Sequence, residues 1–258
     1  MSTMFLELGS VVLAISMATA AGLVGCFAVM RRMTLAADAI SHVALPGVGI
    51  ALLLHFQPVV GALAMLLFGT VLIWSMQERT GISTETIVGV VFSVALAIGS
   101  LITSGEELID ALFGAPAKLT GSETALGLLG AAVVVIFILK ARHSLLVSLV
   151  SPDIALTAGI NVARLNLLYL LAFALTVALG FRYLGVLLMG SLIIIPAATA
   201  RRLARNLNHM LSISVAISVI STVMGSYAGS LLHRDTGPLI ITGAGALFFL
   251  SLVKRQPQ

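Results

Sequence analysis

The sequence predicts an all-α integral membrane protein with eight to nine transmembrane helices, and both composition and patterning support this class. Of the 258 residues, 59% are hydrophobic and 9% are charged, and the mean hydropathy is +1.15. A typical soluble domain is about one-quarter charged. So few charges cannot cover the surface of a water-soluble domain of this size. Lipid must therefore solvate most of the surface.

Nine apolar stretches approach the length of about 20 residues that a helix needs to cross a bilayer. Turn-forming or charged residues such as Arg31, Arg32 and Pro58 separate them. A re-entrant segment or a split helix would reduce the count to eight. No linker, low-complexity tract or internal repeat divides residues 1–258, which predicts a single transmembrane domain. The stretches are 7–30, 35–54, 58–76, 86–104, 123–140, 164–181, 184–200, 211–232 and 238–253.

The basic residues gather on one side of the predicted membrane. With the N-terminus outside and the ends alternating, eleven of the 14 Lys and Arg residues lie on the cytoplasmic side, and Lys118, Arg182 and Arg234 lie outside. Cytoplasmic loops carry an excess of Lys and Arg, so this orientation is favoured over its inverse. Basic residues on the cytoplasmic side thus explain the net charge of +4, and no nucleic-acid partner is expected. The expected location is the cell (inner or plasma) membrane, which the chain crosses several times.

Asp38 and His42 stand four residues apart in the predicted second span. Positions i and i+4 lie on one face of a helix, so the carboxylate and the imidazole can converge. An ionisable side chain inside the membrane costs about 2.5–3.5 kcal/mol on insertion scales, and something must compensate that cost. Asp oxygen and His nitrogen both suit zinc, manganese or iron. The pair is therefore the candidate metal site.

Two ligands from one helix are fewer than the roughly four that a metal site normally has. A two-fold homodimer with this helix on its axis would supply two Asp and two His. Cys26, the only cysteine, forms no metal cluster and is expected to pack in the core. The alternative is that Asp38 pairs with a neighbouring Arg near the cytoplasmic end, and that His42 is a buried hydrogen-bonding residue.

Pro46 follows His42 by four residues and cannot donate a backbone hydrogen bond to the His42 carbonyl. Gly47 loosens the same turn further. The helix is therefore predicted to kink just beyond the polar pair. Such a kink suits a site that must open and close.

Four stretches resemble one family of membrane proteins. Asp38-Ala-Ile-Ser-His-Val-Ala-Leu-Pro-Gly47 resembles the second-helix signature of the metal-importing ABC permeases, the zinc/manganese/iron ABC-3 family. Residues 87–93 are similar to the fourth-span pattern of that family, and residues 151–165 to its cytoplasmic loop. Residues 185–202 resemble its most characteristic segment. The chain departs from the family pattern at Ala37, where many members carry Gly.

The resemblance implies a vitamin-B12-importer-like assembly of two permeases, two cytoplasmic ABC ATPase subunits and an extracytoplasmic metal-binding protein. In such an assembly the chain passes a divalent zinc, manganese or iron ion inward and holds no permanently bound cofactor. Asp38 and His42 would contact the metal in transit, and Pro46 and Gly47 would mark the gating kink. The cytoplasmic loop at about 141–163 would be the coupling element seated on the ATPase.

The residues of that loop fit this role. Ser151, Pro152 and Asp153 form a good helix start, with a cap residue, a proline at the first position and an acid in the first turn. Ala158 and Gly159 fit the end of a short helix. A solvated connecting helix is the alternative. No lysine of the chain lies in a Walker A motif, so ATP hydrolysis is expected from another polypeptide and the chain itself is not an enzyme.

The charged residues on the outer side are weaker candidates for a functional role than Asp38 and His42. Lys118, Arg182 and Arg234 are candidates to pair with acidic residues of a docking metal-binding protein, although exposed ion pairs often contribute little. The acidic residues of the segment 106–110 could concentrate cations at the entrance. A solvated loop is the simpler interpretation of that segment.

Two other functions compete with an ATP-driven permease. A stand-alone secondary metal carrier would normally show more intramembrane acids than Asp38 alone, and it would need no coupling loop. An intramembrane serine protease is disfavoured, because Ser41 and His42 are sequence neighbours and point to different sides of a helix. The sequence does not choose among zinc, manganese and iron.

Overall fold

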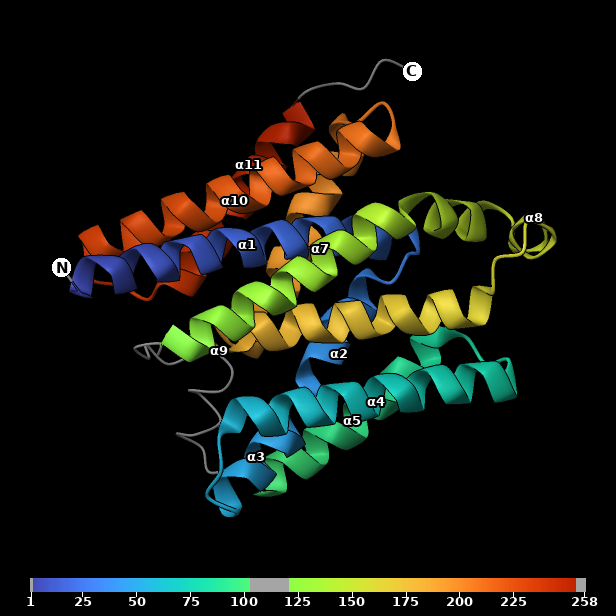
Figure 1. Cartoon of the computed structure of the whole chain (residues 1–258), viewed down its shortest axis with the longest axis horizontal. Coiled ribbons are helices and arrows are strands. Elements are labelled where there is room, and N and C mark those ends of the chain that lie inside the picture. Colours follow the sequence, from blue (N-terminus) through green and yellow to red (C-terminus); the bar gives the residue numbers. More distant parts are fainter. Residues whose placement is uncertain (1, 103–120, 254–258) are drawn as a thin grey trace.

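Every element in the described part of the chain is a helix (Figure 1). The computed structural model describes residues 2–102 and 121–253, with the backbone alone for residues 2–8, 35–38 and 181–188. The predicted fold class is confirmed. In chain order the helices are α1 (Ser2–Met30), α2 (Thr34–His42), α3 (Leu45–Leu53), α4 (Pro58–Thr80), α5 (Thr84–Ile102), α7 (Gly121–Val150), α8 (Pro152–Thr157), α9 (Val162–Leu203), α10 (Leu207–Leu232) and α11 (Thr236–Val253).

Seven of the described helices are long and apolar enough to cross a bilayer. They match seven of the nine predicted stretches to within a few residues, except that α7 continues to Val150, well beyond the predicted end at residue 140. The stretch 35–54 is divided between α2 and α3, and the stretch 184–200 lies in the second half of α9. The spanning segments are Gly9–Met30, Pro58–Thr80, Thr84–Ile102, Gly121–Val150, Val162–Gly180, Leu207–Leu232 and Thr236–Val253.

The first half of α9 runs antiparallel to α1. The Tyr169 hydroxyl donates a hydrogen bond to the Val24 carbonyl at 3.1 Å. One turn earlier, the Asn166 side chain accepts a hydrogen bond from the guanidinium of Arg31, just after the end of α1. As α9 proceeds from residue 166 to 169, it therefore moves from the C-terminal end of α1 toward its middle.

The second half of α9 runs parallel to α1. A Cβ on Gly25 would overlap the carbonyl oxygen of Ile193, so the two backbones are in direct contact there. Eight residues after Ile193, the Arg201 side chain donates to the Val29 carbonyl at 3.1 Å. This half therefore returns along α1 in the direction opposite to the first half.

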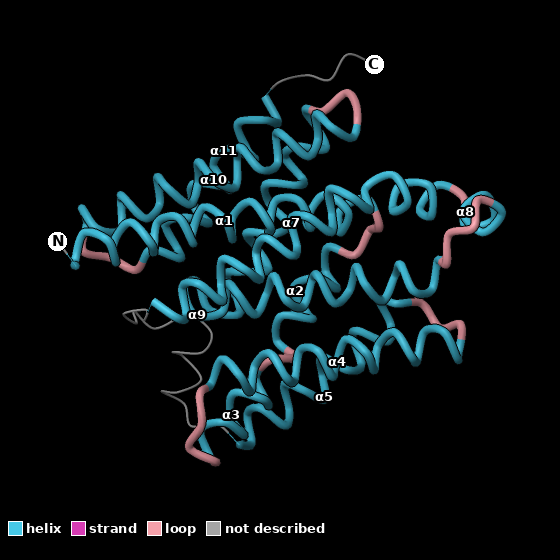
Figure 2. The backbone as a smooth tube through the Cα atoms, viewed as in Figure 1, coloured by secondary structure: helices cyan, strands magenta, loops and turns pink. Residues whose placement is uncertain are grey.

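The reversal within α9 lies between Gly180 and Met189. A Cβ on Gly180 would overlap the Met189 side chain, although nine residues of straight helix span about 13.5 Å. The chain thus passes between the two ends of the bundle twice within α9, and once through α2 and α3 together (Figure 1). Short connections join the helices at both ends (Figure 2).

α1 is the central helix, packed against α7, α9 and α10. Small residues allow these close approaches. A Cβ on Gly22 would lie 3.1 Å from the backbone of Ser214, whose hydroxyl donates to the Gly22 carbonyl at 2.8 Å. Within a bilayer, close backbone approach replaces the hydrophobic effect as the source of helix association.

α7 presents an apolar stripe to the outside of the bundle. Leu126, Leu129, Val133 and Ile136 are all exposed and recur every three or four residues, so they lie on one face of the helix. In a soluble protein such a face would be buried. In this protein it is the surface that contacts lipid.

One end of the bundle collects the basic residues, and we call it the basic end. α1, α4 and α7 end there, α8 lies at its extremity, and α9 both begins and ends there (Figure 1). The positive-inside rule predicts that the basic end lies on the cytoplasmic side of the membrane. Its described Lys and Arg residues are Arg31, Arg32, Arg79, Lys140, Arg142, Arg164, Arg201, Arg202 and Arg205.

Gly47 and Gly61 hold α3 directly against α4. A Cβ on Gly47 would overlap the carbonyl oxygen of Gly61, and a Cβ on Gly61 would overlap the carbonyl oxygen of Gly47. From the sequence, Gly47 was expected to loosen a turn. The structure adds a packing role, because glycine at both positions is what allows the two backbones to touch.

We expect Gly47→Ala to lower the melting temperature of the purified protein. The added methyl group must push α3 and α4 apart, and overpacking of this kind costs about 1–3 kcal/mol, more than alanine gains in helix propensity. The matched control is Gly243→Ala in α11, where a Cβ would meet no atom within 4 Å. Equal thermal unfolding curves for the two variants in detergent would contradict the proposed packing role.

Candidate functional site

Asp38 and His42 both lie in α2, which occupies the middle of the bundle (Figure 1). They are one helical turn apart, so the two positions share a face of the helix. The side chain of Asp38 lies outside the described residues. The geometry of the site is therefore built on His42 and on the backbone around it.

His42 is buried against α5. Only 9% of the residue is exposed, and its ring centroid lies 5.5 Å from that of Phe92, with the ring planes at 57°. α2 also packs against α9. His42 therefore contacts protein on α5 instead of facing acyl chains. A ring held in place by aromatic packing is well prepared to serve as a ligand.

The second pass is interrupted directly after His42. α2 ends at His42, α3 begins at Leu45, and the two intervening N–H groups each bond to a carbonyl three residues back, at 3.0 and 3.3 Å. Pro46, in the first turn of α3, has no N–H to offer the His42 carbonyl. Residues 41–49 are all buried. Irregular backbone at membrane depth is tolerated when protein surrounds it, as it does here.

The part of the chain with described side chains holds no group of three His, Cys, Asp or Glu that could bind a metal ion. Cys26 is buried in α1 as a free thiol. Among the described side chains, His42 is therefore the one predicted ligand on α2 whose surroundings the structure gives. Completing the coordination by a second copy stays a prediction.

α8 is a six-residue helix at the extremity of the basic end (Figure 2). The Ser151 hydroxyl accepts from the Ile154 N–H at 3.4 Å, Pro152 is the first helical residue, and Asp153 lies in the first turn, as the sequence predicted. Ala155 is fully buried, whereas Ile154 and Leu156 are 61% and 59% exposed. A short helix that buries one small residue and exposes two large apolar ones has a surface suited to a partner.

The connection from α8 to α9 is short, and hydrogen bonds hold three of its N–H groups. Ala158 is the C-cap of α8, and Gly159 has a φ of +77°, a left-handed conformation that glycine adopts without strain. The Ile160 N–H closes the turn on the Ala155 carbonyl at 2.9 Å. The Asn161 side chain then caps α9. The predicted loop at about 141–163 consists of the end of α7, α8 and the start of α9.

A polar cluster at the basic end was missed by sequence reasoning. Asn166 of α9 accepts a hydrogen bond from Arg31 and donates one to Oε1 of Gln77 of α4 at 3.3 Å. The Trp74 indole N–H donates to the Ala163 carbonyl at 3.0 Å. The only signal in the sequence was that each of these polar residues lies near the end of an apolar stretch.

Arg31 is the charged member of this cluster. Its guanidinium carbon lies 4.5 Å from the centroid of the Tyr169 ring, a cation–π geometry. Burial lowers the pKa of Arg31 from its ordinary value. That ordinary value is so high that the side chain keeps its charge at neutral pH. From the sequence, Arg31 was expected only to follow the first apolar stretch and to lie on the cytoplasmic side.

The predicted outer cations do not form a described cluster. Arg234 is exposed in the connection between α10 and α11, at the end of the bundle opposite the basic end. Lys118 and the acidic segment 106–110 lie outside the described residues, as does the side chain of Arg182. Arg234 therefore remains the only one of the three whose exposure the structure describes.

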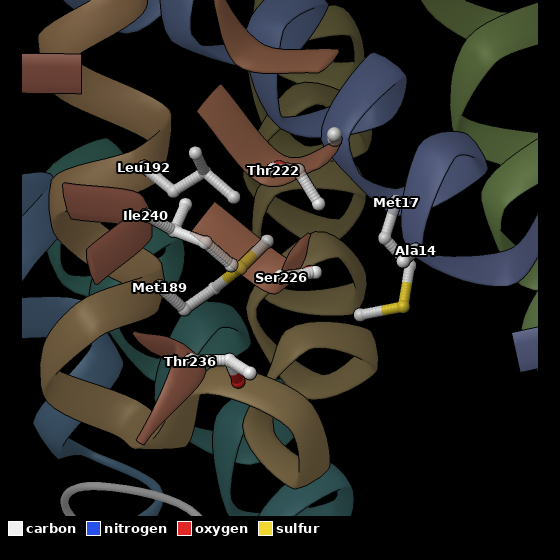
Figure 3. Close-up of a pocket in the computed structure, with 9 residues that line it drawn as sticks. Ala14, Met17, Met189, Leu192, Thr222, Ser226, Thr236 and Ile240 are labelled. Carbon is white, nitrogen blue, oxygen red and sulfur yellow. The ribbon is translucent and has the colours of Figure 1, made fainter. Parts of the chain in front are cut away.

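A small cavity of about 40 Å³ lies between α1, α9, α10 and α11, away from α2. Figure 3 shows that Met189, Ile240 and Leu192 border it on one side and Met17 on the other, with Thr222 and Ser226 between them. This volume accommodates about one or two water molecules. It is too small to be a passage through the protein.

The chain matches one known protein family along almost its whole length. Residues 5–255 match the model of the ABC 3 transport family. The chain belongs to the ABC 3 transport family. This ABC 3 permease is accordingly a multi-pass protein of the plasma membrane, as the apolar helices and the sequence motifs predicted.

Relatives of this ABC 3 permease carry names that state their metal. It is 30% identical over 239 residues to the high-affinity zinc uptake system membrane protein ZnuB of Haemophilus influenzae, covering 90% of this chain and 91% of that protein. It is 29% identical over 247 residues to the manganese import system permease protein ScaB of Streptococcus parasanguinis, covering 94% and 88%.

A solved structure has the same fold. PsaBC from Streptococcus pneumoniae, in complex with Fab, superposes with a TM-score of 0.82 at 26% identity, covering 96% of this ABC 3 permease and 91% of that chain. A metal-chelate type ABC transporter in an inward-facing conformation is also similar, with a TM-score of 0.75 at 16% identity. The second likeness concerns the fold alone.

Proposed function

We propose that this chain is the membrane permease subunit of an ATP-driven importer of a divalent transition metal, zinc or manganese, with iron as a third candidate. The observation that carries the proposal is the family match over residues 5–255, together with relatives named for zinc uptake and manganese import. A permease of this kind passes metal from an extracytoplasmic binding protein to the cytoplasm. It holds the ion only in transit.

We assign the metal contacts to Asp38 and His42. They are one turn apart on a helix in the middle of the bundle, and His42 is packed on Phe92. The helix break directly after His42, with Pro46 and Gly47 following it, gives the second pass a joint at the site. We assign the gating movement to this joint, because a broken helix can tilt one half without deforming the other.

The partner that hydrolyses ATP docks on α8 in this proposal. Ile154 and Leu156 present apolar surface at the extremity of the basic end, where water would otherwise surround them. The capped start at Ser151, Pro152 and Asp153 holds α8 in shape. Burying two such side chains in an ATPase groove would give the contact its affinity.

A second permease copy completes the site in this proposal. α5 contacts His42 through Phe92 on one face and exposes small residues, Gly89, Ser93 and Ala97, on another. Stripes of small residues allow two helices to pack closely within a membrane. Two copies paired through α5 would bring two α2 helices to one passage and would supply two Asp and two His ligands.

The extracytoplasmic metal-binding protein would dock on the end opposite the basic end. Lys118, Arg182 and Arg234 are the candidate contacts, and Arg234 is exposed there. Acidic residues on the binding protein would pair with them. Such contacts contribute more to orientation and rate of association than to affinity.

The alternative function is a stand-alone metal carrier driven by an ion gradient. Proteoliposomes that contain the permease alone distinguish the two. Metal uptake driven by a proton or sodium gradient without any ATPase would favour the carrier. Uptake that requires the ATPase, the binding protein and ATP favours the importer.

We expect Asp38→Ala and His42→Ala each to reduce ATP-driven uptake of zinc or manganese into proteoliposomes by at least about tenfold. Loss of a group that hydrogen-bonds to a metal ligand typically costs about 10- to 100-fold, and loss of the ligand itself should cost at least as much. Radioactive metal taken up per unit time is the measurement. Asp235→Ala and His143→Ala, both at exposed positions, are the controls. Normal uptake by both site variants would refute the metal assignment.

We expect Ile154→Asp and Leu156→Asp to abolish co-purification of the ATPase with the permease. Both positions are exposed, so the fold of the permease and its melting temperature should not change. The matched control is Ile82→Asp, an exposed apolar residue in the connection between α4 and α5. Retention of the ATPase by both α8 variants would place the contact elsewhere.

We expect Ala97→Cys to form a disulfide-linked permease dimer when membranes are treated with an oxidant. The native Cys26 is buried and does not interfere. Leu129→Cys on the lipid-facing stripe of α7 is the control and should remain monomeric on a non-reducing gel. Dimer formation by the control alone would move the interface from α5 to α7.

A further inference from the structure

We propose that Arg31 is a positioning residue that links α8 to α2 through Asn166, so that movement of the ATPase-contact helix is transmitted to the metal-contact helix. This inference rests on the proposed function. Arg31 touches neither the metal nor the ATPase in the proposal. It acts by tying together the segments that do.

The first step of the link is the rigid connection between α8 and α9. The peptide N–H groups of Ala158, Gly159 and Ile160 all bond back to α8 carbonyls, at 3.0, 3.0 and 2.9 Å. The Asn161 side chain caps α9 by accepting from the Arg164 N–H at 2.9 Å. Because these bonds tie three of the four connecting residues back to α8 and the fourth, Asn161, caps α9, a displacement of α8 should move the first turns of α9.

The second step is the anchoring of those turns to the ends of α1 and α4. Asn166 lies in the second turn of α9 and uses its carbonyl oxygen for Arg31 and its amide nitrogen for Gln77. Both ends of its side chain are therefore engaged by different helices. Trp74 adds a third contact through the Ala163 carbonyl.

The third step is the turn from α1 to α2, in which Arg31 is the first residue. The N–H groups of Arg31, Arg32 and Met33 bond to the carbonyls of the last turn of α1, at 2.9, 3.2 and 2.9 Å. Arg32 has a φ of +60°, a strained conformation for a residue with a side chain. The turn is thus tight, and α2 begins immediately after it at Thr34.

The guanidinium of Arg31 fits this role better than a simple surface charge would. It lies over the Tyr169 ring while donating to Asn166, so two residues of α9 hold it from two directions. Tyr169 in turn donates to the Val24 carbonyl within α1. The planar guanidinium provides both stacking and directed hydrogen bonds, which an ammonium group provides less well.

Arg31→Gln tests the link by the metal transported per ATP hydrolysed, with the complete importer in proteoliposomes. We expect this ratio to fall at least about fivefold, the lower end of measured couplings between sites, while ATPase co-purification and basal hydrolysis are kept. Asn166→Ala should have the same effect, and adding it to Arg31→Gln should lower the ratio no further. Arg31→Lys should lower the ratio less than Arg31→Gln does. The control is Arg79→Gln, an exposed residue of α4 at the same end.

A second readout does not require metal transport. In a Thr34→Cys background, the rate of reaction with a water-soluble thiol reagent should change when the ATPase is trapped with a non-hydrolysable ATP analogue. Arg31→Gln should remove that change. An unchanged transport ratio, or a labelling change that persists in Arg31→Gln, overturns the inference. Arg31→Gln could instead lose hydrolysis and transport in parallel while keeping the full labelling change. Arg31 would then have a purely structural role, which also overturns the inference. Absence of ATP-driven uptake with the unaltered permease would instead refute the proposed function.

Discussion

Exclusion of water from the bilayer interior is the constraint on which the rest of the structure depends. A backbone N–H or C=O that loses its helical partner there has no water to replace it. The second pass breaks at Val43 and Ala44, and the break persists because protein buries every residue from 41 to 49. The glycine contacts of α3 with α4 enclose the same segment. The interruption is thus stabilised by the protein that surrounds it, together with the two hydrogen bonds that the Val43 and Ala44 N–H groups make to carbonyls three residues back.

Burial of this kind also explains why the helices that surround α2 differ in character. α7 faces lipid with a continuous apolar stripe, whereas α1 contacts protein on most of its surface. Polar side chains within the spans, such as Ser214, Thr176 and Thr222, donate to backbone carbonyls at 2.7–2.8 Å. These three hydroxyl groups are thereby satisfied within the protein, and most of the described Lys and Arg residues lie at the basic end.

Most of the fold could be predicted from the sequence, because apolar length is a direct physical requirement for a membrane span. The capped start of α8 was also predictable from Ser151, Pro152 and Asp153, since capping depends on neighbouring residues. The reversal within α9 was predicted as a boundary between two stretches, although the residues form one helix along the chain. The contacts of Arg31 with Asn166 and Tyr169 could not be predicted, because they join residues more than 130 positions apart. The metal role of Asp38 and His42 stays a prediction.

The reversal of α9 also bears on how the chain enters the membrane. The segment from Met189 to Leu203 is about 22 Å long at 1.5 Å per residue, shorter than the hydrocarbon core. It is mostly buried against α1 and α11, so protein and not lipid solvates it. A segment of this length spans the hydrocarbon core poorly alone. During synthesis it should therefore integrate together with Val162–Gly180 as a hairpin, after α1 is already in place to receive it.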